Sequence, residues 1–365
     1  MRLMPFTLGK RPALDGIRGC AVAAVVALHA GIGLKGGYLG VQMFFVLSGF
    51  VITAVLLEEA RETGGISLRQ FYARRLLRLI PALVAVLAFV AAYSLLFPAH
   101  APKHQVARAE VGAALYVVNW VFMHFGNKPY LLVHTWSLSI EEQFYLLWPP
   151  VVIALAFTRG KYRSLAQFAV AGVVASVAAR WILIAQGARL DRIYLGTDTR
   201  VDALLIGCVI AIAFYAGWVP TGRAALAAMR VAAVIGAGIV IAAVALWARP
   251  NVRADHGLGL TVIALCTAAV IVTAVAAPSG VFARVLAWSP LTELGKISYG
   301  VYLWHLPIFV VFRNAFPHTT NWVAVPIMTV IALGVSIASY HFIEEPFLRM
   351  KSRFRPIPAG VSVSV

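Results

Sequence analysis

Charged side chains are scarce in this chain, and acidic ones are scarcer still. Only 12% of its 365 residues are charged, with 14 acidic residues against 31 lysines and arginines. Hydrophobic residues make up 61%, which excludes a soluble domain of this length and indicates a polytopic membrane protein. The sequence shows no internal repeat and no low-complexity linker, and we expect no appended soluble domain. We therefore expect one membrane domain over residues 1–365, with a basic cytoplasmic tail from about residue 346.

Cysteine is rare as well, and its placement excludes two further kinds of site. Cys20, Cys208 and Cys266 all lie in apolar runs. Their spacing fits neither a disulfide framework nor the CxxC pattern of a metal site. We expect these cysteines to pack in the core, and we expect no bound metal.

The basic excess gives a formal net charge of +17. Such a charge is compatible with nucleic-acid binding, but the basic residues fall in short segments between apolar runs. Orientation in the membrane and contact with anionic lipid or a phosphorylated ligand account better for that placement. We expect the lipid bilayer as a partner and no nucleic acid. The oligomeric state stays open, a dimer included.

Ten long apolar segments are predicted to be membrane-spanning helices. They cover residues 17–33, 40–57, 79–97, 138–157, 166–185, 201–219, 231–248, 258–277, 297–312 and 322–342. The predicted fold is therefore an all-α bundle of about ten transmembrane helices, in the cytoplasmic membrane.

An eleventh apolar segment, residues 111–125, is shorter and contains Asn119 and His124. Counting it as a span would put the basic loop 159–163 and the basic tail outside the cell, against the positive-inside rule. Ten spans keep both termini cytoplasmic. Segment 111–125 then belongs to an outer connection, as a re-entrant or interfacial helix.

Arg18 and His29 lie eleven positions apart in the first predicted span. In a helix they share nearly one face and are separated by roughly 16 Å along the axis. Ionisable groups inside a membrane are functional candidates by default. The imidazole is suited to take a proton near neutral pH, and a carboxylate that orients its ring would complete a general base. A structural histidine is the alternative.

Arg74, Arg75 and Arg78 mark the start of the third span, in YARRLLRLIPAL. Arg74 and Arg78 share a helix face. Such arginines suit bidentate phosphate binding, and an anchor obeying the positive-inside rule is the alternative. In the second span, Ser48 and Gly49 of FFVLSGFVI are small enough for close helix packing.

The segment HTWSLSIEEQFYLLWPP brings Trp136, Glu141, Glu142 and Tyr145 into the fourth span from the predicted outer side. An unpaired carboxylate in hydrocarbon costs at least about 2.5–3.5 kcal/mol. At least one of the two glutamates should therefore face a partner inside the bundle. The alternative is an interfacial pair solvated by lipid headgroups.

Two later segments carry further polar groups. In YLGTDTRVDALLIG, Asp198, Arg200 and Asp202 are spaced for a local ion network, and helix capping by Thr197 or Asp198 is the alternative. His305 lies about mid-span in LGKISYGVYLWHLPIF, and we interpret it as a hydrogen-bonded core residue.

These motifs follow one another in an order that resembles the acyltransferase-3 family of integral-membrane O-acyltransferases. The resemblance extends from about residue 11 to residue 345. It implies a bundle of about ten membrane helices that modifies sugars or natural products, usually with acyl-CoA. Some members append an extracellular hydrolase-like domain, which we expect this chain to lack.

Spacing and resemblance together give three groups of site residues. The resemblance implies that His29 is the essential histidine, that Arg18 is its partner, and that Arg75 and Arg78 serve the acyl donor. The predicted catalytic group is His29, Arg18, Glu141, Glu142 and Tyr145. The predicted donor-binding group is Arg74, Arg75, Arg78 and Ser48. The predicted acceptor-side group is Trp136, Asp198, Arg200 and Asp202.

The predicted activity is transfer of a short acyl group, acetyl above all, from acyl-CoA to a sugar hydroxyl. The acceptor is either a cell-surface glycan or glycolipid, or a natural product such as a macrolide. The alternative is a transporter or flippase for a small amphipathic or sugar-containing ligand. Transporters often contain repeats with paired interrupted helices, and the sequence has no such pair.

Overall fold

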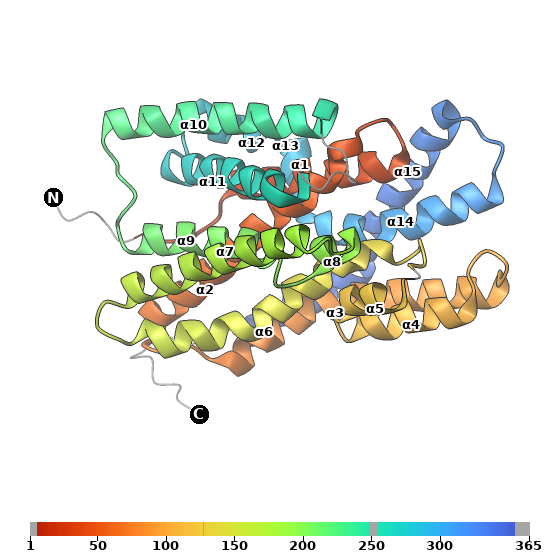
Figure 1. Cartoon of the computed structure of the whole chain (residues 1–365), viewed down its shortest axis with the longest axis horizontal. Helices are drawn as coiled ribbons and strands as arrows, with labels where there is room; N and C mark the ends of the chain where they lie inside the picture. Colours follow the sequence, from red (N-terminus) through yellow and green to blue (C-terminus); the bar gives the residue numbers. More distant parts are fainter. Residues whose placement is uncertain (1–5, 127, 248–254, 355–365) are drawn as a thin grey trace.

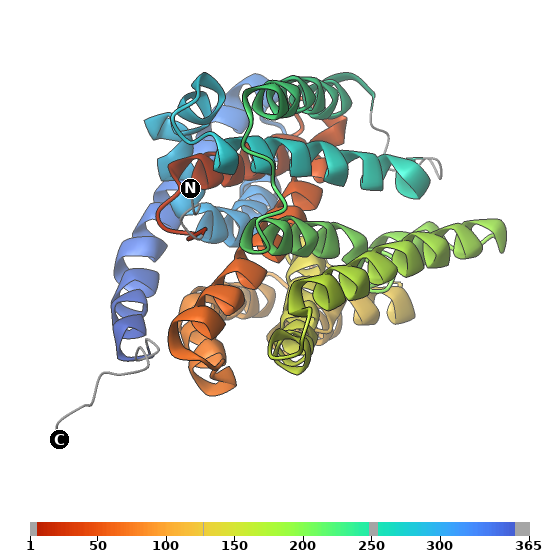
Figure 2. The ribbon, with the colours of Figure 1, turned by 90° about the vertical axis from the view of Figure 1, so that its left-hand side faces the viewer.

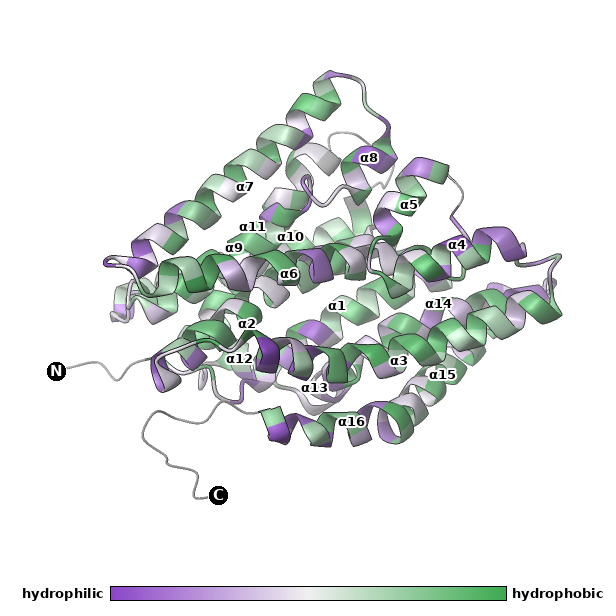
Figure 3. Cartoon of the chain, turned by 90° about the horizontal axis from the view of Figure 1, so that it is seen from below, coloured by the Kyte–Doolittle hydropathy of each residue, from purple (hydrophilic) through white to green (hydrophobic). Residues whose placement is uncertain are grey.

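The computed structural model describes residues 6–126, 128–247 and 255–354, and every regular element in these ranges is helical. The all-α prediction is thus confirmed. Most of the long helices run along the long axis of the molecule (Figure 1). They are apolar over most of their length, and hydrophilic residues gather mainly at helix ends and connections (Figure 3).

Each predicted span lies in or overlaps a helix. The ten helices are α1 (Pro12–Ala30), α2 (Leu39–Thr63), α3 (Leu68–Leu96), α6 (Trp136–Ala156), α7 (Lys161–Ala185), α9 (Val201–Tyr215), α10 (Arg223–Ala242), α11 (Leu260–Ala276), α14 (Ser298–Ala315) and α15 (Asn321–Ser339). Residue 248, which ends the predicted seventh span, and the part of the predicted tail after residue 354 lie outside the described residues.

Fewer helices than the predicted ten qualify as membrane spans by their length and apolar composition. Seven described helices are long and apolar enough to cross a membrane, and an eighth span results if two bent helices act as one. These two are α13 (Ser289–Lys296) and α14, which meet at 74°. α9 has only 15 residues, whereas a span needs about 20. In α6 two glutamates and two prolines reduce the apolar character.

The eleventh segment is not a continuous helix. It divides into α4 (Lys103–Ala114) and α5 (Val118–Phe125), and Tyr116 between them has a φ of 54°. Neither helix is long enough to cross a bilayer. This agrees with the exclusion of 111–125 from the spans, and its place in or at the membrane stays a prediction.

The remaining elements are short. They are the helices α8 (Leu190–Leu195), α12 (Val281–Leu286) and α16 (Glu345–Met350), the 3-10 turns Lys35–Tyr38, Val133–Thr135 and Lys351–Phe354, and the π-helical turns Ala243–Trp247, Asp255–Gly259 and Tyr340–Glu344. The last π turn joins α15 to α16, which packs along α3 (Figure 2).

Glycines allow two helix pairs to meet backbone to backbone. A Cβ on Gly49 of α2 would lie 1.8 Å from the carbonyl oxygen of Leu204 in α9. A Cβ on Gly19 of α1 would lie 2.2 Å from the carbonyl oxygen of Leu291 in α13. No other residue type fits such distances, so the packing role predicted for Gly49 is confirmed.

Both described ends of the chain lie at the α2–α3 turn. The backbone oxygen of Phe6 accepts a hydrogen bond from Arg61, near the end of α2. The backbone oxygen of Phe354 accepts one from Arg74, in the second turn of α3. The two ends therefore share one end of the bundle, as an even number of spans requires. That this end is cytoplasmic stays a prediction.

Candidate active site

A cavity of about 330 Å³ lies among α1, α2, α3, α6, α14 and the turn Lys351–Phe354. Its wall brings together the predicted donor-binding residues and the predicted catalytic residues other than His29. They are Arg18, Ser48, Arg74, Arg75, Arg78, Glu141, Glu142 and Tyr145. Residues from four helices, α1, α2, α3 and α6, thus form one polar surface inside an apolar bundle.

Arg75 is held in the cavity wall by two side chains of α6. Its Nε lies 3.0 Å from each oxygen of the Glu142 carboxylate, and its Nη2 lies 2.5 Å from Oε1. The guanidinium carbon is also 3.3 Å from the ring centre of Tyr145. A bidentate ion pair of this kind fixes the guanidinium plane and neutralises its charge.

Glu141 belongs to the same wall. It accepts hydrogen bonds from Ser48 Oγ at 3.0 Å and from Tyr145 Oη at 3.2 Å. The predicted separation of outer glutamates from inner arginines is wrong, because Glu142 pairs with Arg75 of the basic cluster. The side of the membrane on which this pair lies stays a prediction. Burying charge is costly unless it is paired, and that pairing draws the glutamates and arginines to one depth.

The His29 ring contacts another histidine. His29 Nδ1 lies 3.0 Å from His305 Nε2, and the two ring centres are 5.1 Å apart. Neither glutamate makes a hydrogen bond to His29 in the part of the chain that the structure describes. The prediction that a carboxylate orients this ring is therefore not supported, and His305 occupies that position.

Backbone acceptors decide where the protons of this histidine pair lie. His305 Nδ1 is 3.0 Å from the carbonyl oxygen of Val301, which only accepts, so Nδ1 carries the hydrogen. The ring is fully buried, and its partners among the described residues are the carbonyl oxygen of Val301 and the His29 ring, which favours its neutral form. Its bare Nε2 then accepts from His29 Nδ1–H. In this assignment the free lone pair of His29 is on Nε2.

A third histidine and a tyrosine surround the pair. The ring centres of His134 and His305 are 5.3 Å apart. Burial, with a smaller effect from His29, lowers the pKa of His134 to about 3, so its ring is neutral at physiological pH. Tyr302 Oη donates to the backbone oxygen of His134 at 2.8 Å and lies 2.6 Å from Ser137 Oγ.

Tyr302 and Ser137 line the cavity, whereas His29 does not. The Tyr302 ring centre is 5.8 Å from that of His305, which in turn contacts His29. His29 itself is partly exposed. The imidazole thus stands behind the wall of the cavity rather than in it, with Tyr302 and His305 between the two.

The predicted acceptor-side residues do not form the expected network. Asp198 pairs with Arg192 near the surface, and Asp202 pairs with Arg180 in the core. Arg200 is fully buried, and its guanidinium carbon lies 5.5 Å from the ring centre of Trp136. The ion network predicted from spacing is therefore wrong, because each carboxylate has a closer cation from another segment.

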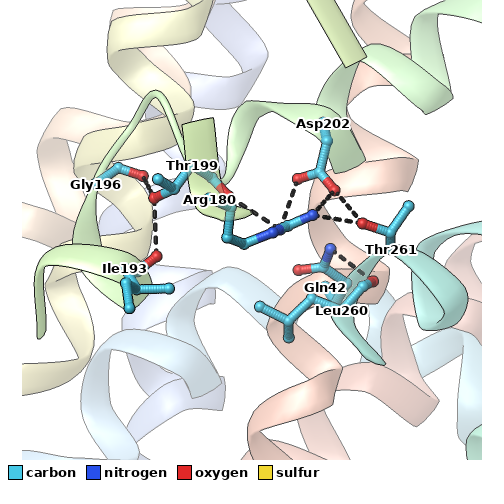
Figure 4. Close-up of polar contacts among 8 residues, drawn as sticks. All are labelled: Gln42, Arg180, Ile193, Gly196, Thr199, Asp202, Leu260 and Thr261. Carbon is cyan, nitrogen blue, oxygen red and sulfur yellow. Dashed lines mark hydrogen bonds and ion pairs between the residues drawn. The ribbon is translucent and has the colours of Figure 1, made fainter. Parts of the chain in front are cut away.

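Arg180 and Asp202 form the centre of a buried polar network, shown in Figure 4. Arg180 Nη2 donates to Asp202 Oδ2 at 2.8 Å and to Thr261 Oγ1 at 2.5 Å. Nη1 donates to the backbone oxygen of Thr199 at 3.0 Å. Both charged side chains are fully buried, so this network joins α7, α9 and α11 away from water.

A protein-family profile described as an acyltransferase domain matches residues 11–341. This range includes nearly the whole cavity wall and both histidines of the pair. The chain belongs to the acyltransferase-3 family. The family resemblance predicted from the six motifs is thereby confirmed, and the apolar helices make this member a multi-pass membrane protein.

Similar proteins within the family carry related names. The chain is 34% identical over 352 residues to O-acetyltransferase OatA of Staphylococcus aureus, covering 92% of this chain and 57% of that protein. It is 33% identical over 349 residues to peptidoglycan O-acetyltransferase OatA of Listeria monocytogenes, covering 92% and 55%. A putative peptidoglycan O-acetyltransferase, YrhL of Bacillus subtilis, is 31% identical over 367 residues, covering 92% and 54%.

The chain therefore spans little more than half the length of these relatives. No solved structure matches it significantly.

Sequence reasoning missed residues of the cavity wall, of the histidine cluster and of the buried network around Asp202. His305 was assigned to the core, and His134, Arg180 and Lys351 were not singled out. Arg180 carried a usable signal, since it is an ionisable residue inside the predicted span 166–185. The contact of His305 with His29 had no such signal, because 276 positions separate the two residues.

Proposed function

We propose that the chain is a membrane O-acetyltransferase that moves an acetyl group from acetyl-CoA to a hydroxyl group of a sugar. The observation that carries this proposal is the pairing of His29 with His305 beside a cavity rich in cations. The family supports acyl transfer, and the names of the relatives support acetyl as the group and a glycan as the acceptor.

The donor binds in the cavity with its phosphates toward the cationic end. Five cationic side chains line the cavity, namely Arg18, Arg74, Arg75, Arg78 and Lys351. The pantetheine arm then extends toward Tyr302 and Ser137 at the other end. Arg18 and His29 lie about 16 Å apart along α1, a separation that such an arm covers.

His29 acts as the general base in this proposal. Its Nε2 takes the proton of the acceptor hydroxyl while the hydroxyl oxygen bonds to the thioester carbonyl carbon. The tetrahedral intermediate collapses, the carbon–sulfur bond breaks, and the thiolate takes the proton back from the imidazolium. The products are the acetyl ester and the free thiol of CoA. A backbone amide near His29 stabilises the oxyanion, because Arg18 lies about 16 Å from His29 along α1 and Tyr145 packs against Arg75.

The acceptor approaches from the end of α1 that carries His29, opposite the cationic end of the cavity. His29 is partly exposed there, whereas Tyr302 and His305 separate it from the cavity. The thioester reaches His29 when the side chain of Tyr302 moves away from Ser137 and opens the wall. A glycan of the cell surface fits this approach, since it would come from the side opposite to a cytoplasmic donor.

Purified protein with acetyl-CoA labelled in the acetyl group tests this function. We expect the label to pass to a cell-wall glycan fragment, with one thiol released for each ester formed. A macrolide carrying free sugar hydroxyls is the second acceptor to offer. Ligand movement across vesicles without thiol release would contradict the proposal and favour the transporter alternative.

His305 is the positioning residue of this base, and its replacement separates orientation from packing. His305→Phe keeps a buried ring but removes the acceptor of the His29 Nδ1–H bond, so we expect kcat to fall about 100-fold. KM for acetyl-CoA should stay unchanged, because His305 does not line the cavity. His305→Gln retains an oxygen acceptor and should recover much of the rate. Equal rates for wild type and His305→Phe would contradict this role.

A further inference from the structure

The C-terminal segment 345–354 forms part of the cavity wall. After the π turn Tyr340–Glu344, α16 runs along α3, and the following turn places Lys351 in the lining. Arg74 Nη1 holds this turn by donating to the backbone oxygen of Phe354 at 2.7 Å. The family match ends at residue 341, so this segment lies beyond the part that defines the family.

Three of the five cations in the wall already have carboxylate partners. Arg18 pairs with Asp15 at 2.7 Å and Arg74 with Glu59 at 2.7 Å, and Arg75 forms its bidentate pair with Glu142. Arg78 and Lys351 make no ion pair within the described ranges.

Arg78 and Lys351 lie near each other at the cavity. The side chain of Arg78 lines the cavity, and its exposed surface faces that space. Glu344 also lies near Arg78, but it forms no ion pair with it within the described residues. Two cations that face one space repel each other, and an anion between them relieves that repulsion.

We propose that Lys351, which lies beyond the family match, joins Arg78 in binding a phosphate or pyrophosphate group of the acyl donor. This inference rests on the proposed function and deepens it. The guanidinium of Arg78 supplies a planar pair of donors, and the ammonium of Lys351 supplies a compact charge from the facing wall. Arg75 then serves to hold Glu142 rather than the phosphate, and the segment 345–354 becomes a wall of the donor site.

Binding of CoA to the full chain in nanodiscs of neutral lipid tests the inference. The variants are Lys351→Gln, Lys351→Arg and, as a matched control on the same segment, Arg353→Gln. Arg353 is exposed and does not line the cavity. Loss of one charge-assisted contact should weaken CoA binding about 10- to 100-fold in Lys351→Gln. Lys351→Arg and Arg353→Gln should bind CoA as the wild type does.

Pantetheine, which has no phosphate, is the second probe. Lys351→Gln should bind it as the wild type does, so that the loss is confined to the phosphate-bearing ligand. Unchanged CoA affinity in Lys351→Gln overturns the inference while leaving the acyl-CoA donor intact. Failure of the wild type to bind CoA overturns the proposed donor itself.

Anionic lipid is the other source of phosphate at a membrane surface. In nanodiscs that contain phosphatidylglycerol, CoA affinity should stay within twofold of its value in neutral lipid. A larger loss in the wild type that is absent from Lys351→Gln would assign the two cations to a lipid headgroup and overturn the inference.

Discussion

Replacing His29 with alanine is expected to lower the rate of acetyl transfer by about 10²–10⁴-fold, the usual contribution of a general base. The imidazole Nε2 carries the only lone pair of the histidine pair that is left for an acceptor hydroxyl. CoA binding should be unaffected, because His29 does not line the cavity. Initial rates of ester formation and equilibrium binding of CoA, measured on the same preparation, check both parts.

The exposed His318 provides the matched control, since it lies in the connection between α14 and α15. His318→Ala should keep the wild-type rate. A His29→Ala protein that turns over as fast as the wild type would remove the base from the mechanism. Loss of CoA binding in that variant would show instead that the helix, and not only the chemistry, depends on the ring.

Replacing Asp202 with leucine is expected to give the largest loss of stability. Asp202 and Arg180 are both fully buried, so the variant leaves a guanidinium without its counterion in the core. Removing one partner of a buried pair typically costs about 3–5 kcal/mol. Unfolding of the detergent-solubilised protein, followed by tryptophan fluorescence, should show a clear decrease in midpoint.

Two further variants distinguish this cause from a general defect. Asp198→Leu breaks the more exposed pair with Arg192, whose side chains are 45% and 33% exposed, and should cost at most about 1 kcal/mol. The double variant Arg180→Met with Asp202→Leu removes both charges and should recover much of the lost stability. If it is no more stable than Asp202→Leu alone, the buried charge is not the cause.

The fold class could be predicted because hydrophobic runs long enough to span a bilayer leave few alternatives to helices. Boundaries could be predicted less well. α3 begins at Leu68 rather than at residue 79, because Ser67 caps its first turn by accepting from the backbone nitrogen of Gln70. Arg74, Arg75 and Arg78 therefore lie within the helix, two to three turns deep, where Glu142 of α6 reaches Arg75.

The site could be predicted as a set of residues but not as a set of contacts. Spacing placed Arg18 and His29 on one helix, and both are on α1 as expected. Which glutamate meets which arginine depends on how α3 and α6 pack, and no local pattern encodes that packing. His305 illustrates the same limit. Its own segment indicates a core residue, but its ring contacts that of His29, 276 positions away.

Gly49 and Gly19 carry a consequence for movement within this bundle. At both positions main chain rests on main chain, with no layer of flexible side chains to yield. Many transporters work by rocking one group of helices against another. In this bundle, a movement of α2 against α9 or of α1 against α13 would break these close backbone contacts. Such rigid helix pairs suit a protein in which the substrates move to the site while the helices keep their relative positions.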